Sequence, residues 1–318
     1  MQHDGPVDFE AYRGELVACC YRMLGSFHEA EDAVQETLLR AWKARDRYDE
    51  TRASVRTWLY RIATNVCLTA LEGRARRPLP SGLGAAGEDP EVPLVPALDI
   101  PWLEPFPSAQ FDLEARADLR LAWVAAVQVL PARQRAVLVL RDVLAFSAAE
   151  VAQQLETSVA AVNSALQRAR AAVADLGDPA TLTEADNAAS REVVQGYIRA
   201  FEAADVPALV RLLADDAVLE MPPVPLWYRG SRDYGRFMDR VFAMRGPGWS
   251  VREVAANDQP ALAAYAPEPD GGHRLHSLQV LAVADGRVAH NVVFADPRAF
   301  DGFDLPREMS ADDLRHPR

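Results

Sequence analysis

The stretch SAAEVAQQLETSVAAVNSALQRAR, residues 147–170, decides the fold of the region around it. Ser147 followed by Glu150 has the form of a capping box, which predicts a short helix over AAEVAQQL. Three residues, 156–158, connect it to VAAVNSALQRARAAVADL, whose apolar spacing predicts a longer helix. A short helix, a tight turn and a longer helix form a helix-turn-helix. The second helix is therefore a candidate to lie in a DNA groove.

The two predicted helices divide their residues between a packed and an outward face. The apolar positions expected to hold them together are Val151, Leu155, Val159, Val162, Leu166 and Ala169. The positions left outward are Asn163, Ser164, Gln167, Arg168 and Arg170. Such side chains suit base edges and phosphates, but they are also common on an ordinary solvated helix. The pattern alone leaves both interpretations open.

The residues that precede this motif also predict helices. Residues 111–130 form one long helical pattern that stops at Pro131, and residues 132–144 form another. Near the N-terminus, helical spacing runs to Gly25, and Ser26 with Glu29 begins a helix through DAVQETLLRAW, residues 32–42. A third helix covers SVRTWLYRIATNVCLTALE, residues 54–72, and ends at Gly73. Two helical segments are therefore expected.

A cluster of arginines and aromatic residues accompanies the third helix. Arg56, Arg61, Arg74, Arg76 and Arg77 are suited to a phosphate backbone, and Trp58 and Tyr60 to stacked bases. Asn65 lies in the middle of the helix, where asparagine is unfavourable, and this favours a functional role. Core packing is the alternative for the aromatic residues.

The last part of the chain changes its period. Helical patterns in residues 191–203, 206–214 and 231–244 give way to strand patterns in 249–255, 260–268, 273–284 and 288–296. Asp285-Gly286 is a favoured hairpin turn between the last two strands. Helices on a curved antiparallel sheet, an α+β sandwich, are expected, and such a sheet commonly encloses an apolar pocket.

Composition and charge narrow the classes of function. The chain has 318 residues and a formal charge of −12, but residues 78–110 hold five acidic and no basic groups, and the helical segments are balanced. DNA binding by the front half is therefore compatible with the charge. Three cysteines and scattered histidines predict no disulfide framework and no metal site. The absence of a signal pattern or long apolar run predicts a cytoplasmic protein that does not enter the membrane.

The order of these motifs resembles the extracytoplasmic-function (ECF) sigma factors of bacterial RNA polymerase. DAVQETLLRAW, VRTWLYRIATNVCLTAL and the helix-turn-helix ending in QRAR carry the resemblance. It implies that Asp32, Gln35, Glu36 and Leu39 bind the β′ coiled coil of core polymerase. The β subunit of core polymerase is a further expected partner. The resemblance also implies that Trp58, Arg61, Asn65, Arg74, Arg76 and Arg77 melt and hold the −10 element. Asn163, Ser164, Gln167, Arg168 and Arg170 would bind the −35 element.

The sequence also departs from the usual sigma pattern. Ala160-Ala161-Val162 stands where Gly-Thr-Val is usual, and Asn163 stands where a basic residue is usual. Thr69 and Glu72 replace the usual acidic and basic residues near the −10 segment. These differences bear on the promoter sequence and not on the class.

The third segment resembles the SnoaL-like family, within the cystatin-like α+β fold. WLEPFP, with Trp102, Leu103 and Pro105, is similar to a linker motif of sigma factors that carry this extension. Asp285, Gly286, Arg287 and Asp296 lie where those groups have loop motifs. The resemblance implies that this domain tunes the sigma factor. Holding a 33-residue flexible linker at one spacing costs entropy, which a third domain packed across the linker and both DNA-binding domains would reduce.

The expected organisation is a multidomain chain of two all-α domains followed by an α+β SnoaL-like domain. Residues 1–77 are region 2, 78–111 a Pro/Gly-rich acidic linker, 112–177 region 4, 187–305 the SnoaL-like domain and 306–318 a tail. No cofactor and no catalysis are expected, and a small ligand in the last domain is possible. Two alternatives remain open. One is a dimeric helix-turn-helix repressor. The other is a cyclase or isomerase whose pocket is lined by Trp227, Tyr228, His276, His290, Asn291 and Asp296.

Overall fold

The computed structural model describes residues 8–111, 119–175, 188–269 and 271–310. They fall into two compact units. The N-terminal unit comprises residues 1–76, 110–119 and 124–177, and the C-terminal unit comprises 77–109, 120–123 and 178–318. The linker is thus part of the C-terminal unit, whereas the two predicted DNA-binding segments share the N-terminal unit. The stretch between the predicted region 4, which ends at 177, and the predicted SnoaL-like domain, which begins at 187, lies outside the described residues.

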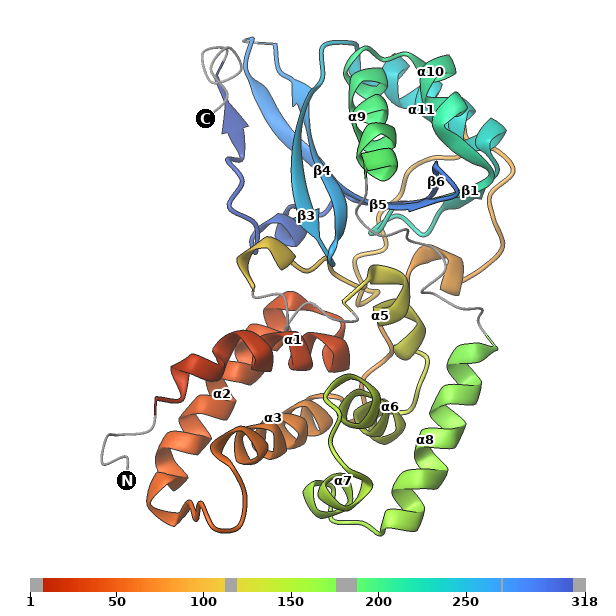
Figure 1. The fold of residues 1–318 in the computed structure, drawn as a ribbon. Helices are drawn as coiled ribbons and strands as arrows, with labels where there is room; N and C mark the ends of the chain where they lie inside the picture. Colours follow the sequence, from red (N-terminus) through yellow and green to blue (C-terminus); the bar gives the residue numbers. More distant parts are fainter. Residues whose placement is uncertain (1–7, 112–118, 176–187, 270, 311–318) are drawn as a thin grey trace. The chain divides into compact units, whose positions relative to one another are not determined.

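The N-terminal unit is helical, as predicted (Figure 1). Its helices are α1 (Arg13–Leu24), α2 (Phe27–Ala44), α3 (Val55–Ala70), α6 (Ala132–Leu138), α7 (Ala148–Gln154) and α8 (Val159–Ala174). Helix α1 ends at Gly25, whose φ of +69° is the left-handed cap that glycine adopts without strain. The Ser26 hydroxyl accepts the Glu29 amide and begins α2, and both halves of the predicted capping box at Ser147 and Glu150 are formed.

The prediction of one long helix over residues 111–130 is wrong for the described residues. Residues 112–118 lie outside the described part, and α5 covers only Leu121–Val127. The Leu121 amide donates to the side-chain oxygen of Gln259 at 2.8 Å. In a longer helix this amide would instead donate to a carbonyl of the preceding turn. The helix predicted for residues 132–144 is present, but it widens into a π-helical turn over Val139–Val143.

The C-terminal unit is the predicted α+β sandwich, in which helices cover one face of a curved sheet (Figure 1). The helices are α9 (Ala188–Glu202), α10 (Val206–Leu212) and α11 (Ser231–Arg245). The strands are β1 (Leu213–Glu220), β2 (Trp227–Arg229), β3 (Ser250–Ala256), β4 (Gln259–Pro267), β5 (His273–Ala284), β6 (Arg287–Phe294) and β7 (Glu308–Met309). The order is β2-β1-β6-β5-β4-β3, with β7 beside β5; β1 and β6 are parallel and the other pairs antiparallel.

Strands β3, β4, β5 and β6 confirm the four predicted strands, but β1, β2 and β7 were not predicted. Residues 206–214 were expected to be helical throughout, whereas α10 ends at Leu212 and β1 begins at once. Pairing of β1 with both β2 and β6 supplies the hydrogen bonds that local helical spacing did not anticipate. The hairpin turn at Asp285 and Gly286 is confirmed, with φ of +51° and +66°.

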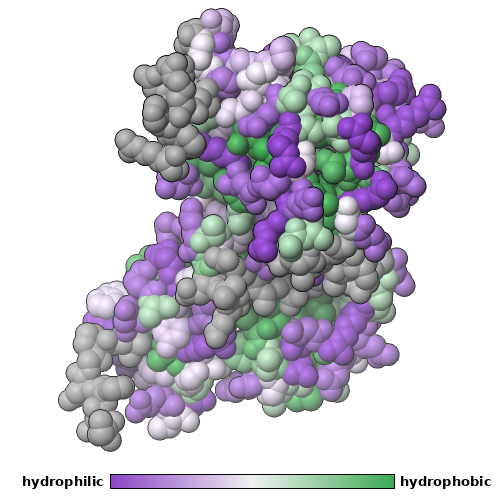
Figure 2. All heavy atoms as spheres, turned by 45° about the horizontal axis from the view of Figure 1, so that its top comes forward, coloured by the Kyte–Doolittle hydropathy of each residue, from purple (hydrophilic) through white to green (hydrophobic). Residues whose placement is uncertain are grey.

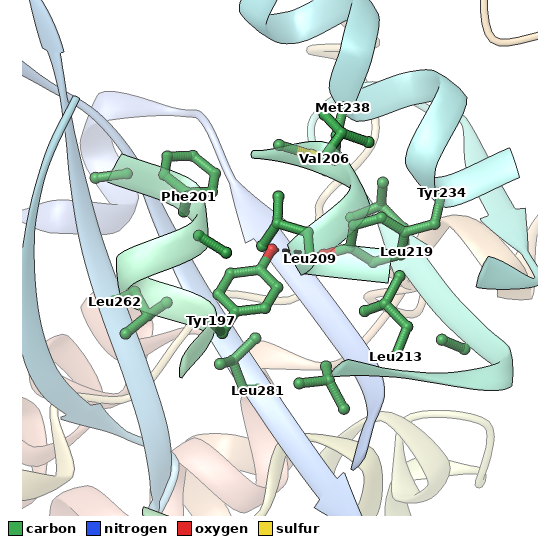
Figure 3. Close-up of a cluster of buried hydrophobic side chains, with 14 of the residues drawn as sticks. Tyr197, Phe201, Val206, Leu209, Leu213, Leu219, Tyr234, Met238, Leu262 and Leu281 are labelled. Carbon is green, nitrogen blue, oxygen red and sulfur yellow. Dashed lines mark hydrogen bonds between the residues drawn. The ribbon is translucent and has the colours of Figure 1, made fainter. Parts of the chain in front are cut away.

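Figure 3 shows the core of this domain, where side chains of α9, α10 and α11 meet the sheet. Phe201 stacks edge-on against Phe242 and Trp249, each at a centroid distance of 5.3 Å. Tyr197 and Tyr234 point toward each other and share a hydrogen bond of 2.7 Å. These fully buried rings fix the helices on the sheet.

Candidate functional site

One face of α2 carries the residues predicted to bind polymerase. Asp32, Gln35 and Leu39 are exposed, and Glu36 is half-buried and bonded to Arg40 at 2.6 Å. Hydrophilic side chains cover most of the described surface visible in Figure 2, so large exposed apolar side chains are notable. On α2 they are Leu39, 46% exposed, and Trp42, 55% exposed. Sequence analysis missed Trp42, although its i+3 spacing from Leu39 indicates a shared face.

The predicted −10 residues on α3 differ in their surroundings. Trp58 is half-buried between Phe9 and Tyr48, at centroid distances of 5.9 and 5.0 Å. Arg61 is half-buried and pairs with Glu156, in the turn of the helix-turn-helix, at 3.0 Å. Of these three residues, only Asn65 is exposed.

The arginines that follow α3 are placed apart. Arg74 is exposed and pairs with Glu29 at 2.6 Å, and Arg76 is exposed. Arg77 lies in the C-terminal unit, where it donates to the Trp102 carbonyl at 2.8 Å and lies 3.8 Å from Glu104. The structure therefore associates Arg77 with the linker.

Helix α8 presents all five predicted −35 residues to solvent. Val162, Leu166 and Ala169 are buried, which orients the opposite face outward. Val159 was expected to be packed, but it is the first residue of α8 and is 44% exposed. Arg170 makes two hydrogen bonds to Asp142, at 2.9 and 2.7 Å, so its guanidinium is already held.

The two helical segments pack against each other inside the N-terminal unit. Arg135 on α6 is 4% exposed, and its guanidinium donates to main-chain oxygens of Met23, Gln128 and Leu130 and to the Gln128 side chain. Burial lowers the pKa of Arg135 to about 10, so it remains charged near neutral pH. Tyr60 on α3 meets Phe146 edge-on at 5.6 Å. Candidate DNA-binding surfaces thus belong to one compact body.

Buried polar contacts hold the linker on the C-terminal domain. The prediction of a flexible linker is therefore wrong for the described residues. Asn257 in the β3–β4 turn is fully buried. Its side-chain oxygen accepts the Phe106 main-chain amide, and its own main-chain amide donates to the Phe106 carbonyl, both at 2.9 Å. The predicted motif residues Trp102, Leu103 and Pro105 are buried beside Phe106. Linker attachment therefore depends on a turn that no motif had marked.

A second attachment lies at the start of the linker. Glu220 on β1 is 1% exposed and accepts the Ser81 amide at 2.7 Å and the His290 ring nitrogen at 2.8 Å. Burial by itself would raise the pKa of Glu220, but the His290 and Ser81 contacts together hold it below its usual value. His290 thus has a structural partner.

The other predicted loop residues are also engaged within the domain. Arg287 donates to the Leu213 carbonyl at 3.1 Å, and Asp296 pairs with Arg298 at 2.7 Å. Both contacts are made within the C-terminal domain. These residues remain predicted regulatory positions.

A buried network occupies the interior where sequence analysis placed a pocket. Asn291 donates to Tyr234, Gln279 and Tyr197 at 2.7, 3.0 and 3.1 Å. Burial raises the pKa of Tyr234 to about 12 and lowers that of His276 to about 4, the latter with help from Arg245. His276 packs edge-on against Trp249 at 5.2 Å. A ligand for this domain remains a prediction.

Comparison with known proteins matches three parts of the chain. Residues 9–77 match Sigma-70 region 2, 120–173 match Sigma-70 region 4, and 194–291 match a SnoaL-like domain. The ECF RNA polymerase sigma factor SigG of Mycobacterium tuberculosis is 47% identical over 310 residues, which cover 94% of this chain and 83% of SigG. The chain belongs to the ECF RNA polymerase sigma factors.

A second relative supports the same assignment for this sigma factor. SigJ of Mycobacterium tuberculosis is 32% identical over 309 residues, 94% of each chain. The crystal structure of a SigJ has a TM-score of 0.66 at 28% identity and covers 94% of this chain and 99% of its own. The predicted class and architecture are confirmed. A sigma factor is not an enzyme, so the cyclase alternative is excluded, and the repressor alternative falls with the family assignment.

No helix in the described part of this sigma factor combines the length and apolarity needed to cross a membrane.

Proposed function

We propose that this sigma factor binds core RNA polymerase through the exposed face of α2. The face combines the carboxylates of Asp32 and Glu36 with the exposed apolar side chains of Leu39 and Trp42. Exposed apolar groups beside charges are typical of protein–protein contacts. This face carries the proposal, and the polymerase β′ coiled coil is its partner. The expected location is the cytoplasm, where polymerase and promoters are found.

Promoter recognition is divided between two helices. The α3 segment with Trp58, Arg61 and Asn65, followed by Arg74, Arg76 and Arg77, holds the unpaired −10 strand, because separated bases require aromatic and polar contacts. The outward face of α8 binds the −35 duplex, because a helix with short polar and arginine side chains suits the major groove.

The packed N-terminal unit is the resting state in this proposal. The −10 and −35 elements are about 25 base pairs apart, or roughly 85 Å at 3.4 Å per base pair. A compact body the size of the N-terminal unit, about 140 residues, is only roughly 40 Å across. The contacts of Arg135 and Arg61 must therefore separate before both elements are bound together.

The C-terminal domain regulates that separation by holding the linker. Free residues 77–109 would extend to roughly 110 Å, enough to join the two promoter elements. Attachment of Ser81 to Glu220 and of Phe106 to Asn257 removes most of this reach. We infer that the attached linker restrains opening and that its release favours the promoter-bound form.

Co-elution with bacterial core RNA polymerase on size exclusion tests the proposed function. The full chain is expected to co-elute, and Asp32→Ala with Glu36→Ala is expected to weaken the complex. A chain with Asp215→Ala and Asp216→Ala is the control, because it loses the same charge at exposed positions of β1. Absence of a complex with the wild-type chain, or equal loss in both variants, contradicts the proposal.

A further inference from the structure

The turn of the helix-turn-helix contains an unusual backbone position. Helix α7 ends at Gln154, and the Thr157 amide donates to the Ala152 carbonyl at 2.9 Å, which is the hydrogen bond of a Schellman cap. This cap requires a left-handed residue just before Thr157, and Glu156 supplies it with a φ of +51°. Glycine is usual at such a position, because a side chain raises the energy of the left-handed backbone. The turn by itself therefore does not explain a glutamate.

The side chain of Glu156 reaches the other helical segment. Its carboxylate accepts a hydrogen bond from the Arg61 guanidinium on α3 at 3.0 Å, across 95 positions of sequence. The Glu156 side chain is 78% exposed, so packing does not hold it in this place. Residues kept in sparsely populated backbone regions cluster at functional positions. The backbone of Glu156 and its long-range contact together indicate a role for this side chain.

Arg61 is one of the residues proposed to hold the −10 strand. A guanidinium binds a carboxylate and a phosphate through the same N–H donors. While Glu156 accepts from Arg61, that donor is not available to a promoter phosphate. Both residues lie in the N-terminal unit, and the pair joins its region 2 and region 4 segments. The pair therefore exists only while these segments are packed together.

We propose that Glu156 takes the place of a promoter phosphate and keeps Arg61 from DNA until the two helical segments separate. The inference rests on the proposed function, because it requires that Arg61 contacts the −10 strand. Glu156 is in the turn that leads into α8, which begins at Val159. Opening of the unit therefore moves the −35 helix away from α3 and frees Arg61 in one step. The free chain thus has a lower affinity for DNA than the polymerase-bound chain.

The ion pair is weak, which suits this role. The Arg61 side chain is 43% exposed, and an ion pair between exposed side chains changes an equilibrium by a factor of about two to five. The buried contacts of Arg135 contribute more to the packing of the unit. Glu156 therefore adjusts how readily Arg61 becomes available, and core polymerase can displace the pair without a large cost.

The test is transcription from a promoter fragment selected by the holoenzyme, with core polymerase fixed and the full chain titrated. Glu156→Gln is expected to reach half-maximal transcription at about two- to fivefold lower chain concentration. Its plateau should equal that of the wild type, because polymerase-bound chain has already separated its segments. Glu156→Gly also relieves the backbone, so it should titrate like Glu156→Gln without a lower melting temperature.

Arg61→Gln removes the other partner of the pair. It should lower the plateau, because Arg61 contacts the −10 strand. Adding Glu156→Gln to Arg61→Gln should not shift the half-maximal concentration further, since the pair is already lost. Asp175→Asn removes the same charge from an exposed position at the end of α8. It is the matched control and should titrate like the wild type.

A second measurement uses the isolated full chain without polymerase. Fluorescence anisotropy with a labelled single-stranded oligonucleotide should show about two- to fivefold tighter binding by Glu156→Gln than by the wild type or Asp175→Asn. The gain should disappear when Arg61→Gln is also present. This measurement reports the competition for Arg61 directly.

Four results would overturn the assignment. They are an unchanged half-maximal concentration in Glu156→Gln, an equal shift in Asp175→Asn, a shift that persists beside Arg61→Gln, and an altered plateau in Glu156→Gln. The last would show that Glu156 acts on DNA within the holoenzyme. If the wild-type chain supports no transcription, the proposed function fails, and the oligonucleotide measurement still decides whether Glu156 competes for Arg61.

Discussion

The guanidinium of Arg135 on α6 donates a hydrogen bond to the main-chain oxygen of Met23 in α1. These residues belong to the region 4 and region 2 segments, so the bond joins the two predicted DNA-binding parts of the sigma factor. The guanidinium also satisfies the carbonyls of Gln128 and Leu130 within the region 4 segment, and it acts alongside the Arg61–Glu156 pair and the Tyr60–Phe146 contact. The strength of this contact determines how readily the N-terminal unit opens.

Arg135→Met is expected to loosen the packed unit. The change keeps the apolar stem but leaves buried carbonyls without a donor, at a cost of about 2–4 kcal/mol. Urea unfolding followed by circular dichroism measures the loss, and small-angle scattering should show a larger radius. Arg133→Met, at an exposed position of the same helix, is the control. Equal stability of the two variants would contradict the role given to Arg135.

The apolar part of the α2 face should contribute to core binding. Leu39→Ser with Trp42→Ser is expected to lower the affinity for core polymerase about tenfold or more without lowering the melting temperature, since both side chains are exposed. Fluorescence anisotropy with labelled chain measures the affinity. Leu83→Ser removes an equally exposed leucine from the linker and should have no effect. A similar loss in both chains would assign the effect to general surface hydrophobicity.

Two neighbouring arginines of α8 should differ in their effect on DNA. Arg168→Ala is expected to reduce affinity for selected promoter DNA about tenfold, because its exposed side chain is available to a base or phosphate. Arg170→Ala should reduce it less than about threefold, because Asp142 already holds that guanidinium. Promoter fragments selected from a random library by the holoenzyme provide the substrate. The reverse order of effects would show that Arg170 leaves Asp142 for DNA.

Release of the linker is tested at the β3–β4 turn. Asn257→Gly tolerates the φ of +56° at this position and removes the oxygen that accepts the Phe106 amide. We expect faster proteolysis within residues 78–109 and higher affinity for core polymerase. Asn257→Asp keeps an acceptor and should behave more like the wild type. Faster proteolysis with unchanged polymerase affinity would separate linker attachment from regulation.

The pH dependence of stability should report His276. Its pKa falls from 6.5 to about 4 on folding, chiefly through burial, so the unfolded chain binds the proton more readily. The His276 contribution is therefore complete above about pH 6.5 and is lost as the pH falls toward 4, by up to about 2–3 kcal/mol. The free energy of unfolding of His276→Gln should therefore change less with pH between about 6.5 and 4 than that of the wild type. Superimposable slopes for the two chains would show that folding does not lower the pKa of His276.

The sequence by itself determined the class and most elements of this protein. Local signals are strong at Ser147 with Glu150, at Ser26 with Glu29 and at Asp285-Gly286, because capping boxes and hairpin turns depend on residues a few positions apart. The capping box at Ser147 and the hairpin turn formed as predicted, and at Ser26 the hydroxyl accepts the Glu29 amide and begins the predicted helix. The order of helical motifs, together with the WLEPFP linker, was specific enough to indicate the family that the comparisons show.

Only the tertiary structure decided which residues satisfy one another over long separations. Glu220 bonds Ser81 139 positions away, Asn257 bonds Phe106 151 positions away, and Arg135 bonds Met23 across 112 positions. A buried polar group must find a partner, but its own sequence neighbourhood does not specify which one. For the same reason the sequence predicted a flexible linker and an arginine cluster suited to a phosphate backbone, whereas the fold attaches the linker to a sheet domain and gives Arg61, Arg74 and Arg77 individual partners.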